Sequence, residues 1–460
     1  MRMKRREFIG GALASCGLWE LGGCRLFRPS DLRFGVLSDI HVRENGGKDR
    51  CYGGDATYLR KALEYFRAQD VDAVMIAGDL TDGGRASELK EIAAVWFDVF
   101  PEGCGVEKLF VSGNHDWWGM KGVARMKALW EESWREPYES LWHKTVKGYH
   151  FLGQHWENYE PCTGAPFDGL GPWLERNGDL VRGRRPFFYV QHPHPKDTCF
   201  GEHAWGHDAG NVTAALSAFP NAVAFSGHSH NSHLDERSIW QGSFTSVNTA
   251  SLRYGGCPDN SVSGRGCENG LKGDGKLMPR YDSFSTKSGL LVVVSDREIV
   301  YSRRDFQHDR PLGPDWVQPL PAIENRVFGF AERAGKERPP EFAPEAKVFV
   351  RKVAVRPRKV LKDVGPADVV ALEIRFPAAN AGGARPFTYE ISVAGDGAAP
   401  LVRSVIAEGF DQTIESPRAQ GESVAVLALS SFPRGANAIT VTPVSSLGTR
   451  GRPLKSGLST

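Results

Sequence analysis

Residues 71–82 decide the fold, and they read Val-Asp-Ala-Val-Met-Ile-Ala-Gly-Asp-Leu-Thr-Asp. The run at 71–77 is short, largely apolar and rich in β-branched residues, a pattern typical of a buried strand. A glycine and two aspartates follow at 78–82, so carboxylate groups lie on a loop directly beyond the predicted strand. In α/β proteins the functional groups gather at the carboxyl ends of the strands. This stretch therefore predicts an α/β domain with its chemistry on such loops.

Strand and helix patterns alternate on either side of this stretch. Further strands are predicted at 32–38 and 108–112, and apolar residues recur at helical spacing within 55–69 and 89–96. This βαβαβ order indicates parallel strands joined by helical crossovers. Later apolar runs predict four more strands, at 148–153, 186–191, 222–226 and 290–294.

Five polar motifs each follow a predicted strand. They are Asp39-Ile40-His41, Gly78-Asp79-Leu80-Thr81-Asp82, Gly113-Asn114-His115-Asp116, His192-Pro193-His194-Pro195 and Gly227-His228-Ser229-His230. Glycines precede three of them, which lets the backbone turn sharply there. Imidazoles spaced this closely repel one another when protonated and are costly to bury without a partner. Each motif alone is weak, but five in this order point to a single site.

The five motifs together resemble the signature of the calcineurin-like metallophosphoesterase superfamily, and the resemblance covers residues 32–305. It implies an α/β fold in which a β-sandwich is flanked by helices in four layers, αββα. It also implies an enzyme that hydrolyses phosphomonoesters or phosphodiesters by attack of a hydroxide bridging two divalent metal ions. The substrate expected from this resemblance is a phosphate ester.

The resemblance also implies the metal ligands. The first ion would be held by Asp39, His41, Asp79 and His230, and the second by Asp79, Asn114, His192 and His228, with Asp79 bridging the two. Such mixed oxygen and nitrogen ligands suit Fe, Mn, Zn or Co. His192 directly follows its strand and is preferred to the alternative, His194, on strand geometry. The chain has no Cys-x-x-Cys pair, so a thiolate zinc site is not expected.

Three residues beside the ligands are expected to assist them. By resemblance, His115 would protonate the leaving oxygen or stabilise its developing charge, with Asp116 fixing the tautomer of His115. Asp82 is expected to orient a ligand. Trp117 and Trp118 follow the same motif and form either a cleft wall or part of the core.

The remainder of the chain reads differently. Residues 306–345 are rich in proline and charge and are expected to be a covering segment and linker. Residues 346–460 contain regularly spaced short strands without helices, which predicts a small all-β sandwich of the fibronectin or immunoglobulin type. A length of 460 residues agrees with two folded units and a short tail.

Residues 1–23 are predicted to be an export signal. Arg5-Arg6-Glu7-Phe8-Ile9 resembles the twin-arginine signal, and the apolar run that follows is too short to span a bilayer. Leu21-Gly22-Gly23-Cys24 resembles a lipoprotein cleavage box, so a lipid anchor at Cys24 and a tether over 24–31 are expected. The alternative is an ordinary signal peptide with Cys24 incidental. The protein is expected in the periplasm or at the cell surface, anchored to the membrane as a lipoprotein if Cys24 is acylated.

Charge and cysteine content agree with an exported enzyme. The formal net charge is +2, and all of the excess lies in residues 1–23. So small a charge excludes a nucleic-acid binder that works through a broad basic surface. Apart from Cys16 and Cys24, six cysteines remain, an even number in an oxidising compartment. Cys257 and Cys267 bracket a Gly/Asn/Ser-rich loop and are the best candidates for a disulfide; the alternative is that both are free.

A second hypothesis is a catalytically idle surface-binding protein that keeps a metal site for stability. The intact pair His115 and Asp116 argues against it, since a structural site would not require them. A carbohydrate-binding role for residues 346–460 is weaker, because tryptophan is absent after Trp316.

Overall fold

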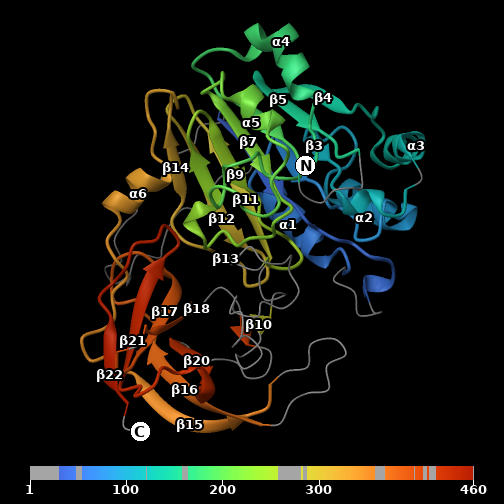
Figure 1. Ribbon diagram of the computed structural model, residues 1–460. Coiled ribbons are helices and arrows are strands. Elements are labelled where there is room, and N and C mark those ends of the chain that lie inside the picture. The colour runs from blue at the N-terminus through green and yellow to red at the C-terminus, as the bar shows by residue number, and fades with distance from the viewer. Residues whose placement is uncertain are drawn as a thin grey trace, which may run out of the picture.

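The computed structural model describes residues 31–47, 54–120, 122–157, 164–256, 281–282, 287–357, 368–397, 399–407, 412–413 and 421–458. Two sheets pack face to face in the first part of the chain, and a smaller β region follows (Figure 1). The export signal, Cys24 and the pair Cys257 and Cys267 lie outside the described residues. Within them, Cys104 is exposed, Cys199 is buried, and both are free thiols.

The first sheet has the strand order β13-β12-β11-β1-β2-β3, with β14 also paired to β12. β1, β2 and β3 run parallel, as predicted, whereas β11 is antiparallel to β1. β14 comes from the predicted covering segment and extends the sheet. The strands are β1 (Leu32–Leu37), β2 (Ala73–Ala77), β3 (Glu107–Val111), β11 (Ser288–Val294), β12 (Glu298–Asp305), β13 (Arg310–Pro311) and β14 (Trp316–Pro319).

The second sheet has the strand order β4-β5-β6-β7-β9-β8. Its central strands β5, β6, β7 and β9 are parallel, and the two edge strands are antiparallel to their neighbours. The strands are β4 (Leu141–Val146), β5 (Tyr149–Gln154), β6 (Phe187–Val190), β7 (Ala222–Ser226), β8 (Ile239–Gln241) and β9 (Thr245–Asn248).

Helices cover the outer faces of the two sheets, which gives the predicted αββα layering (Figure 1). The α-helices are α1 (Thr57–Ala68), α2 (Ala86–Val99), α3 (Val123–Trp134), α4 (Leu170–Val181) and α5 (Asn211–Leu216). Short 3₁₀ helices are η1 (Glu44–Gly47), η2 (His115–Trp117), η3 (Glu236–Ser238) and η5 (Leu429–Ser431). Between the sheets, the ring of Phe34 meets those of Phe151, Phe188 and Phe225 edge-on, with centroids 5.4, 5.2 and 5.7 Å away. Such contacts favour a close-packed, dry interface between the sheets.

The C-terminal part consists of antiparallel sheets, which lie apart from the first two sheets in Figure 1. One sheet has the order β15-β16-β20 and the other β18-β17-β21-β22, and buried residues of both share one core. This agrees with the predicted all-β region, while its fibronectin-like identity stays a prediction. The strands are β15 (Phe349–Val355), β16 (Val369–Pro377), β17 (Pro386–Ala394), β18 (Leu401–Ile406), β20 (Glu422–Ala428), β21 (Ala438–Ser445) and β22 (Leu454–Gly457).

Two further connections join the parts of the chain. Helix α6 (Phe330–Lys336) lies in the predicted linker, and β10 (Tyr281–Asp282) pairs with β19 (Gln412–Thr413). A small apolar cluster combines Leu234 and Leu312 with Phe387 and Ile406 of the C-terminal part. No helix among the described residues is long and apolar enough to cross a membrane.

Candidate metal centre

The polar motifs meet at one edge of the two packed sheets, where the parallel strands end. The loops after β1, β2 and β3 of the first sheet carry Asp39, His41, Asp79 and Asn114, and those after β6 and β7 of the second carry His192, His228 and His230. Side chains from both sheets therefore face one another across the interface, and all seven residues are buried.

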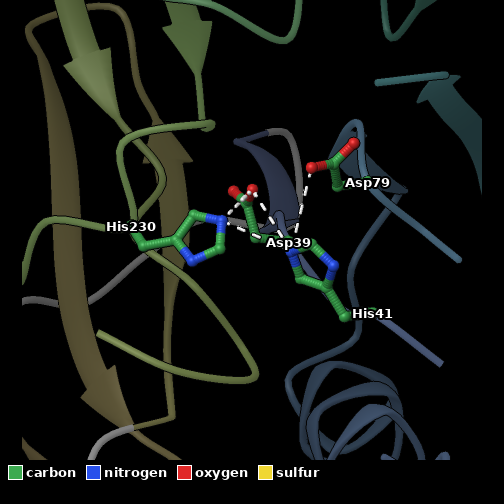
Figure 2. A group of neighbouring side chains, drawn as sticks. All are labelled: Asp39, His41, Asp79 and His230. Atoms are coloured by element: carbon green, nitrogen blue, oxygen red, sulfur yellow. Dashed lines mark hydrogen bonds and ion pairs between the residues drawn. The ribbon is translucent and has the colours of Figure 1, made fainter. Parts of the chain in front are cut away.

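The first group consists of Asp39, His41, Asp79 and His230, whose ligand atoms lie within 4.8 Å of one another. Figure 2 shows His230 approaching from one side and His41 and Asp79 from the other, with Asp39 between them. His230 Nε2 lies 2.7 Å from Asp39 Oδ1 and 3.3 Å from His41 Nε2. His41 Nε2 is 3.9 Å from Asp39 Oδ1 and 3.7 Å from Asp79 Oδ2.

The second group consists of Asp79, His192 and His228, with Asn114 beside them. His192 Nε2 lies 3.2 Å from Asp79 Oδ2, 3.1 Å from Asn114 Oδ1 and 3.1 Å from His228 Nδ1. The same oxygen, Asp79 Oδ2, faces His41 of the first group and His192 of the second. The structure thus brings together the two residue sets named from the sequence, with Asp79 common to both.

In Asp39 and in Asp79, one carboxylate oxygen accepts hydrogen bonds from neighbouring protein groups and the other faces the centre. Asp39 Oδ2 accepts hydrogen bonds from the Ser38 hydroxyl and the His228 backbone N–H, and Asp79 Oδ1 accepts one from the His115 N–H at 2.9 Å. The other oxygens turn toward the imidazoles. Asp39 Oδ1 is buried and has no donor in hydrogen-bonding geometry. An orphaned buried acceptor among nitrogen and oxygen ligands fits a bound cation.

The electrostatics of the centre favour positive charge. Burial alone would raise the pKa of Asp39, yet the facing His230 imidazole lowers it to about 2. Burial likewise opposes protonation of His192, but the neighbouring Asp79 carboxylate raises the pKa of His192 to about 9. Burial also acts against ionisation of Asp79, and His192 together with His115 still holds its pKa well below the usual range. The carboxylates stay ionised and require cations, whether protons or metal ions, beside them.

The backbone is strained at five of these residues. The φ angles are positive at Asp39 (52°), His41 (48°), Asp79 (49°), His228 (69°) and His230 (56°). A side chain in this left-handed region costs roughly 1–2 kcal/mol, and glycine would adopt it without that penalty. Strain of this kind concentrates at functional sites because the side chain itself is required there.

The three glycines that open motifs differ in their roles. Only Gly78 is left-handed, with φ of 87°, so glycine is needed there for the backbone conformation, whereas Gly113 and Gly227 do not have positive φ. The backbone still turns sharply after Gly227, where the Ser229 N–H donates to the Gly227 carbonyl at 2.8 Å. Gly113 and Gly227 leave space instead. A Cβ atom on Gly113 would collide with the Asp79 carboxylate, and one on Gly227 with Ser38 and Asp39. Their small size lets the loops carrying Asn114 and His228 approach the carboxylates.

His192 and His194 take different positions. His192 Nδ1 donates to the Ala77 carbonyl at 2.7 Å, which directs Nε2 to the centre. His194 is buried away from the ligand groups, where Nδ1 meets the Ser226 hydroxyl at 2.7 Å and Nε2 meets the Ser229 hydroxyl at 2.8 Å. It therefore links the end of β7 to the loop that carries His228 and His230.

The expected partnership of Asp116 with His115 is wrong. Asp116 accepts hydrogen bonds from the backbone N–H groups of Leu80, Thr81 and Gly113 and from the Thr81 hydroxyl. The tautomer of His115 is set by the Asp82 carbonyl, which accepts from Nδ1 at 2.9 Å. The reason is that η2 turns the Asp116 side chain inward, toward the preceding loops. Asp116 thereby fastens the second motif to the third.

The ring of His115 lies edge-on to His41, with centroids 4.5 Å apart. Its Nε2 has no hydrogen-bond partner in the part of the chain that the structure describes. Because a carbonyl can only accept, Nδ1 keeps its proton and His115 gains or loses a proton at Nε2. Burial lowers the pKa of His115 to about 4, so the ring is neutral at pH 7. Asp82 also lies 3.3 Å from His41 Nδ1, through its carboxylate Oδ1.

Aromatic residues surround the ligands, and the sequence analysis did not single out Trp205 and Tyr254. Trp205 stacks on His228 with ring centroids 4.8 Å apart, and Tyr254 packs against His230 at 4.3 Å and His41 at 5.2 Å. Nothing in the sequence marks them, because both reach the centre from irregular loops. The adjacent Trp117 and Trp118 differ: the first is buried, and the second is 54 % exposed.

Comparison with known proteins agrees with this geometry. Residues 32–232 match the model of the calcineurin-like phosphoesterase family, and all five motifs fall within them. This part of the chain is a calcineurin-like metallophosphoesterase domain. No curated protein matches the chain.

Several solved structures are similar to the chain, each over 63 % of its length. A purple acid phosphatase from yellow lupin (Lupinus luteus) seeds shares 12 % identity over 54 % of its own chain, with a TM-score of 0.41. A predicted phosphoesterase from Streptococcus pneumoniae shares 14 % identity over 98 % of its own chain, with a TM-score of 0.29. Vps29 from Entamoeba histolytica, complexed with zinc, shares 13 % identity over 98 % of its own chain, with a TM-score of 0.30.

Proposed function

We propose that the metallophosphoesterase domain hydrolyses phosphate monoesters or diesters at a centre for two divalent metal ions. One observation carries this proposal: buried carboxylate, amide and imidazole groups from both sheets converge, and five of the residues concerned hold strained left-handed backbone. A packing or stability role would not require that strain, because glycine or an apolar side chain would fill these positions at lower cost.

Two ligand sets share Asp79 in this proposal. Asp39, His41, Asp79 and His230 hold one ion, and Asp79, Asn114, His192 and His228 hold the other. When bound, such ions lower the pKa of a shared water and neutralise the phosphoryl oxygens, and Fe, Mn, Zn and Co all suit the ligands. The chain's own contribution is orientation: the Ala77 carbonyl aims His192, and Asp82 sits against the far nitrogen of His41.

His115 is the residue proposed to act on the leaving group. Hydrolysis breaks the bond between phosphorus and the leaving oxygen, water supplies the new oxygen on phosphorus, and the leaving alcohol takes up one proton. In the proposed step, a phosphate ester bound beside Nε2 raises the pKa of His115, and the protonated Nε2 then delivers that proton or stabilises the charge that develops on the leaving oxygen. The Asp82 carbonyl keeps Nδ1 protonated throughout, so the exchange occurs at Nε2.

The test is turnover by protein reconstituted separately with Mn²⁺, Zn²⁺, Fe²⁺ and Co²⁺, on p-nitrophenyl phosphate and on its bis ester. At least one metal should support turnover, and the preferred ester distinguishes a monoesterase from a diesterase. His115→Ala should keep its metal and lose roughly 10²–10⁴-fold in kcat. A matched control is His150→Ala, at the amino end of β5 and away from the strand ends that form the centre. Metal-loaded protein inactive on both esters would overturn the proposal in favour of an idle binding protein.

We also propose that the chain is exported in a folded state, with a lipid anchor at Cys24. The support is the twin-arginine-like segment Arg5-Arg6-Glu7-Phe8-Ile9 and the box that ends at Cys24. Replacement of Arg5 and Arg6 by lysine should shift the protein to the cytoplasmic fraction. An unchanged distribution would refute twin-arginine export.

A further inference from the structure

Trp118 is a large aromatic side chain left open at the centre. It follows η2 directly, and its backbone N–H donates to the His115 carbonyl at 3.2 Å. Its ring lies over that of His115 with centroids 3.6 Å apart and planes 31° apart, yet 54 % of the residue is exposed. Its neighbour Trp117 is buried, so of these two tryptophans only Trp118 is exposed.

The position of Trp118 relates it to the leaving group. One face of the His115 ring is covered by Trp118, the edge meets His41, and Nδ1 is held by the Asp82 carbonyl. Under the proposed function the leaving oxygen binds at Nε2 of the ring that Trp118 covers, so Trp118 is an exposed aromatic side chain next to the leaving group. An indole face offers van der Waals and stacking contact, and it matches the shape of a flat aromatic ring over a large area.

A second indole, that of Trp205, lies in the loop between β6 and α5. Trp205 is half-buried and stacks on His228, with centroids 4.8 Å and planes 21° apart. Tyr254 is buried against His41 and His230, so it fills space next to the ligands and leaves no open face there. The exposed aromatic surface is thus concentrated at Trp118, on the leaving-group side.

We infer that this domain acts on phosphate esters whose leaving group carries a flat aromatic ring, and that Trp118 determines this specificity. The inference rests on the proposed function and names its substrate class. Two sources share the chemistry, an aryl-bearing alcohol and a nucleoside. In both, a planar ring stacks on Trp118 while the ester oxygen meets His115.

The experiment compares leaving groups that are alkoxides of similar basicity but differ in the ring. Benzyl phosphate is paired with n-butyl phosphate, and adenosine 5′-monophosphate with ribose 5-phosphate; methyl diesters of the same alcohols replace them if the enzyme proves to be a diesterase. Wild-type kcat/KM should be about two- to twelvefold higher for the ring-bearing member of at least one pair, the range of one aromatic contact, and that pair identifies the source. Trp118→Leu should reduce the preference by about two- to twelvefold, the range of one aromatic contact, with the ring-free ester changed less than threefold.

Two further measurements make the outcome decisive. Benzylphosphonate should bind the metal-loaded wild type more tightly than butylphosphonate by calorimetry, and Trp118→Leu should remove the difference while Trp118→Phe keeps most of it. Trp173→Leu is the matched control, because Trp173 is half-buried and meets a histidine, His143, at 5.1 Å on a helix outside the centre. Its preference should equal that of the wild type.

The failures are distinguishable. Wild-type turnover without a ring preference, or an equal loss on both esters of a pair in Trp118→Leu, would overturn the inference and leave the phosphoesterase proposal intact. An equal loss would mean that Trp118 only orients His115. Absence of turnover on every ester would instead refute the proposed function itself.

Discussion

At the scale of single residues, the centre combines two features. The backbone is strained where a ligand side chain is needed, and glycine is present where the loops need space. Asp39, Asp79 and His228 hold left-handed backbone although glycine would adopt it more readily. Gly113 and Gly227 show the opposite case. Their φ angles are not positive, and glycine is needed there because the Asp79 and Asp39 carboxylates leave no room for a Cβ atom. Both features follow from packing loops of two sheets around the same ligand atoms.

Gly227→Ala tests this reading. The added Cβ would collide with the Ser38 hydroxyl and the Asp39 carboxylate, so Asp39 must move away from His230. We expect at least a 100-fold loss of kcat/KM and weaker metal retention on dialysis, measured by elemental analysis. Gly171→Ala is the control, because its Cβ would meet nothing within 4 Å in helix α4 and should leave activity unchanged. Normal metal content in Gly227→Ala would contradict the tight approach of the two loops.

At the scale of elements, strand ends supply the ligands and cross-sheet hydrogen bonds align them. His192 of the second sheet donates to the Ala77 carbonyl of the first, and the His228 N–H donates to Asp39 at 3.1 Å. These contacts fix the position of the two sheets relative to each other at the edge where the centre lies. His194 adds rigidity within the second sheet through its two serine contacts.

His194→Phe should separate positioning from ligation. The phenyl ring fills the same space but cannot bind Ser226 or Ser229, so the loop carrying His228 and His230 loses its restraint. Metal affinity should fall about 10–100-fold in a chelator competition, while saturating metal still gives two ions per chain. Ser226→Ala removes one of the two contacts and should give a smaller loss. A saturating stoichiometry of one ion in His194→Phe would show that His194 is a ligand.

Sequence patterns predicted the strands and the motif positions well because both depend on local order. The strands predicted at 71–77 and 222–226 appear as β2 and β7 within two residues at each end. Contacts made through space were not predictable: the Asp82 carbonyl on His115, and Trp205 on His228, depend on how loops fold against each other. The short antiparallel edge strands β4 and β8 also escaped prediction, since neither has a strong apolar run.

At the scale of the whole molecule, Glu236 joins the three parts of the chain. Its carboxylate accepts from Arg303 of β12 at 2.8 Å, Trp316 of β14 at 2.8 Å and Arg333 of α6, and its N–H donates to Ser446 Oγ beyond β21 at 3.1 Å. Glu236 follows the motif that carries His228 and His230 by only a few residues. The C-terminal part is therefore fastened close to a ligand-bearing loop.

The contribution of Glu236 should depend on pH. Burial alone would raise its pKa, but the Arg303 and Arg333 guanidinium groups more than offset this and lower it below the ordinary 4.5. A lowered carboxyl pKa stabilises the folded state above the unfolded value, and that stability is lost as the pH falls through the folded value. In metal-free protein, Glu236→Gln should lower stability by about 2 kcal/mol at pH 7, and the difference from wild type should shrink below pH 4.5.

Thermal unfolding from pH 7 to pH 3 measures this difference. Glu324→Gln is the control, because Glu324 pairs with Arg184 where both side chains are exposed and should change stability by less than about 1 kcal/mol. A Glu236→Gln deficit that is constant with pH would mean that the charge of Glu236 does not hold the parts together.

The central claim, a centre for two metal ions that share Asp79, is tested most directly by metal content and turnover of Asp79→Asn. Wild type should hold two ions per chain after reconstitution, whereas Asp79→Asn should hold at most one and lose at least about 1,000-fold in kcat. Asp72→Asn, at the opposite end of the β2 region, controls for the loss of a carboxylate and should match the wild type. Two ions and full turnover in Asp79→Asn would contradict the account.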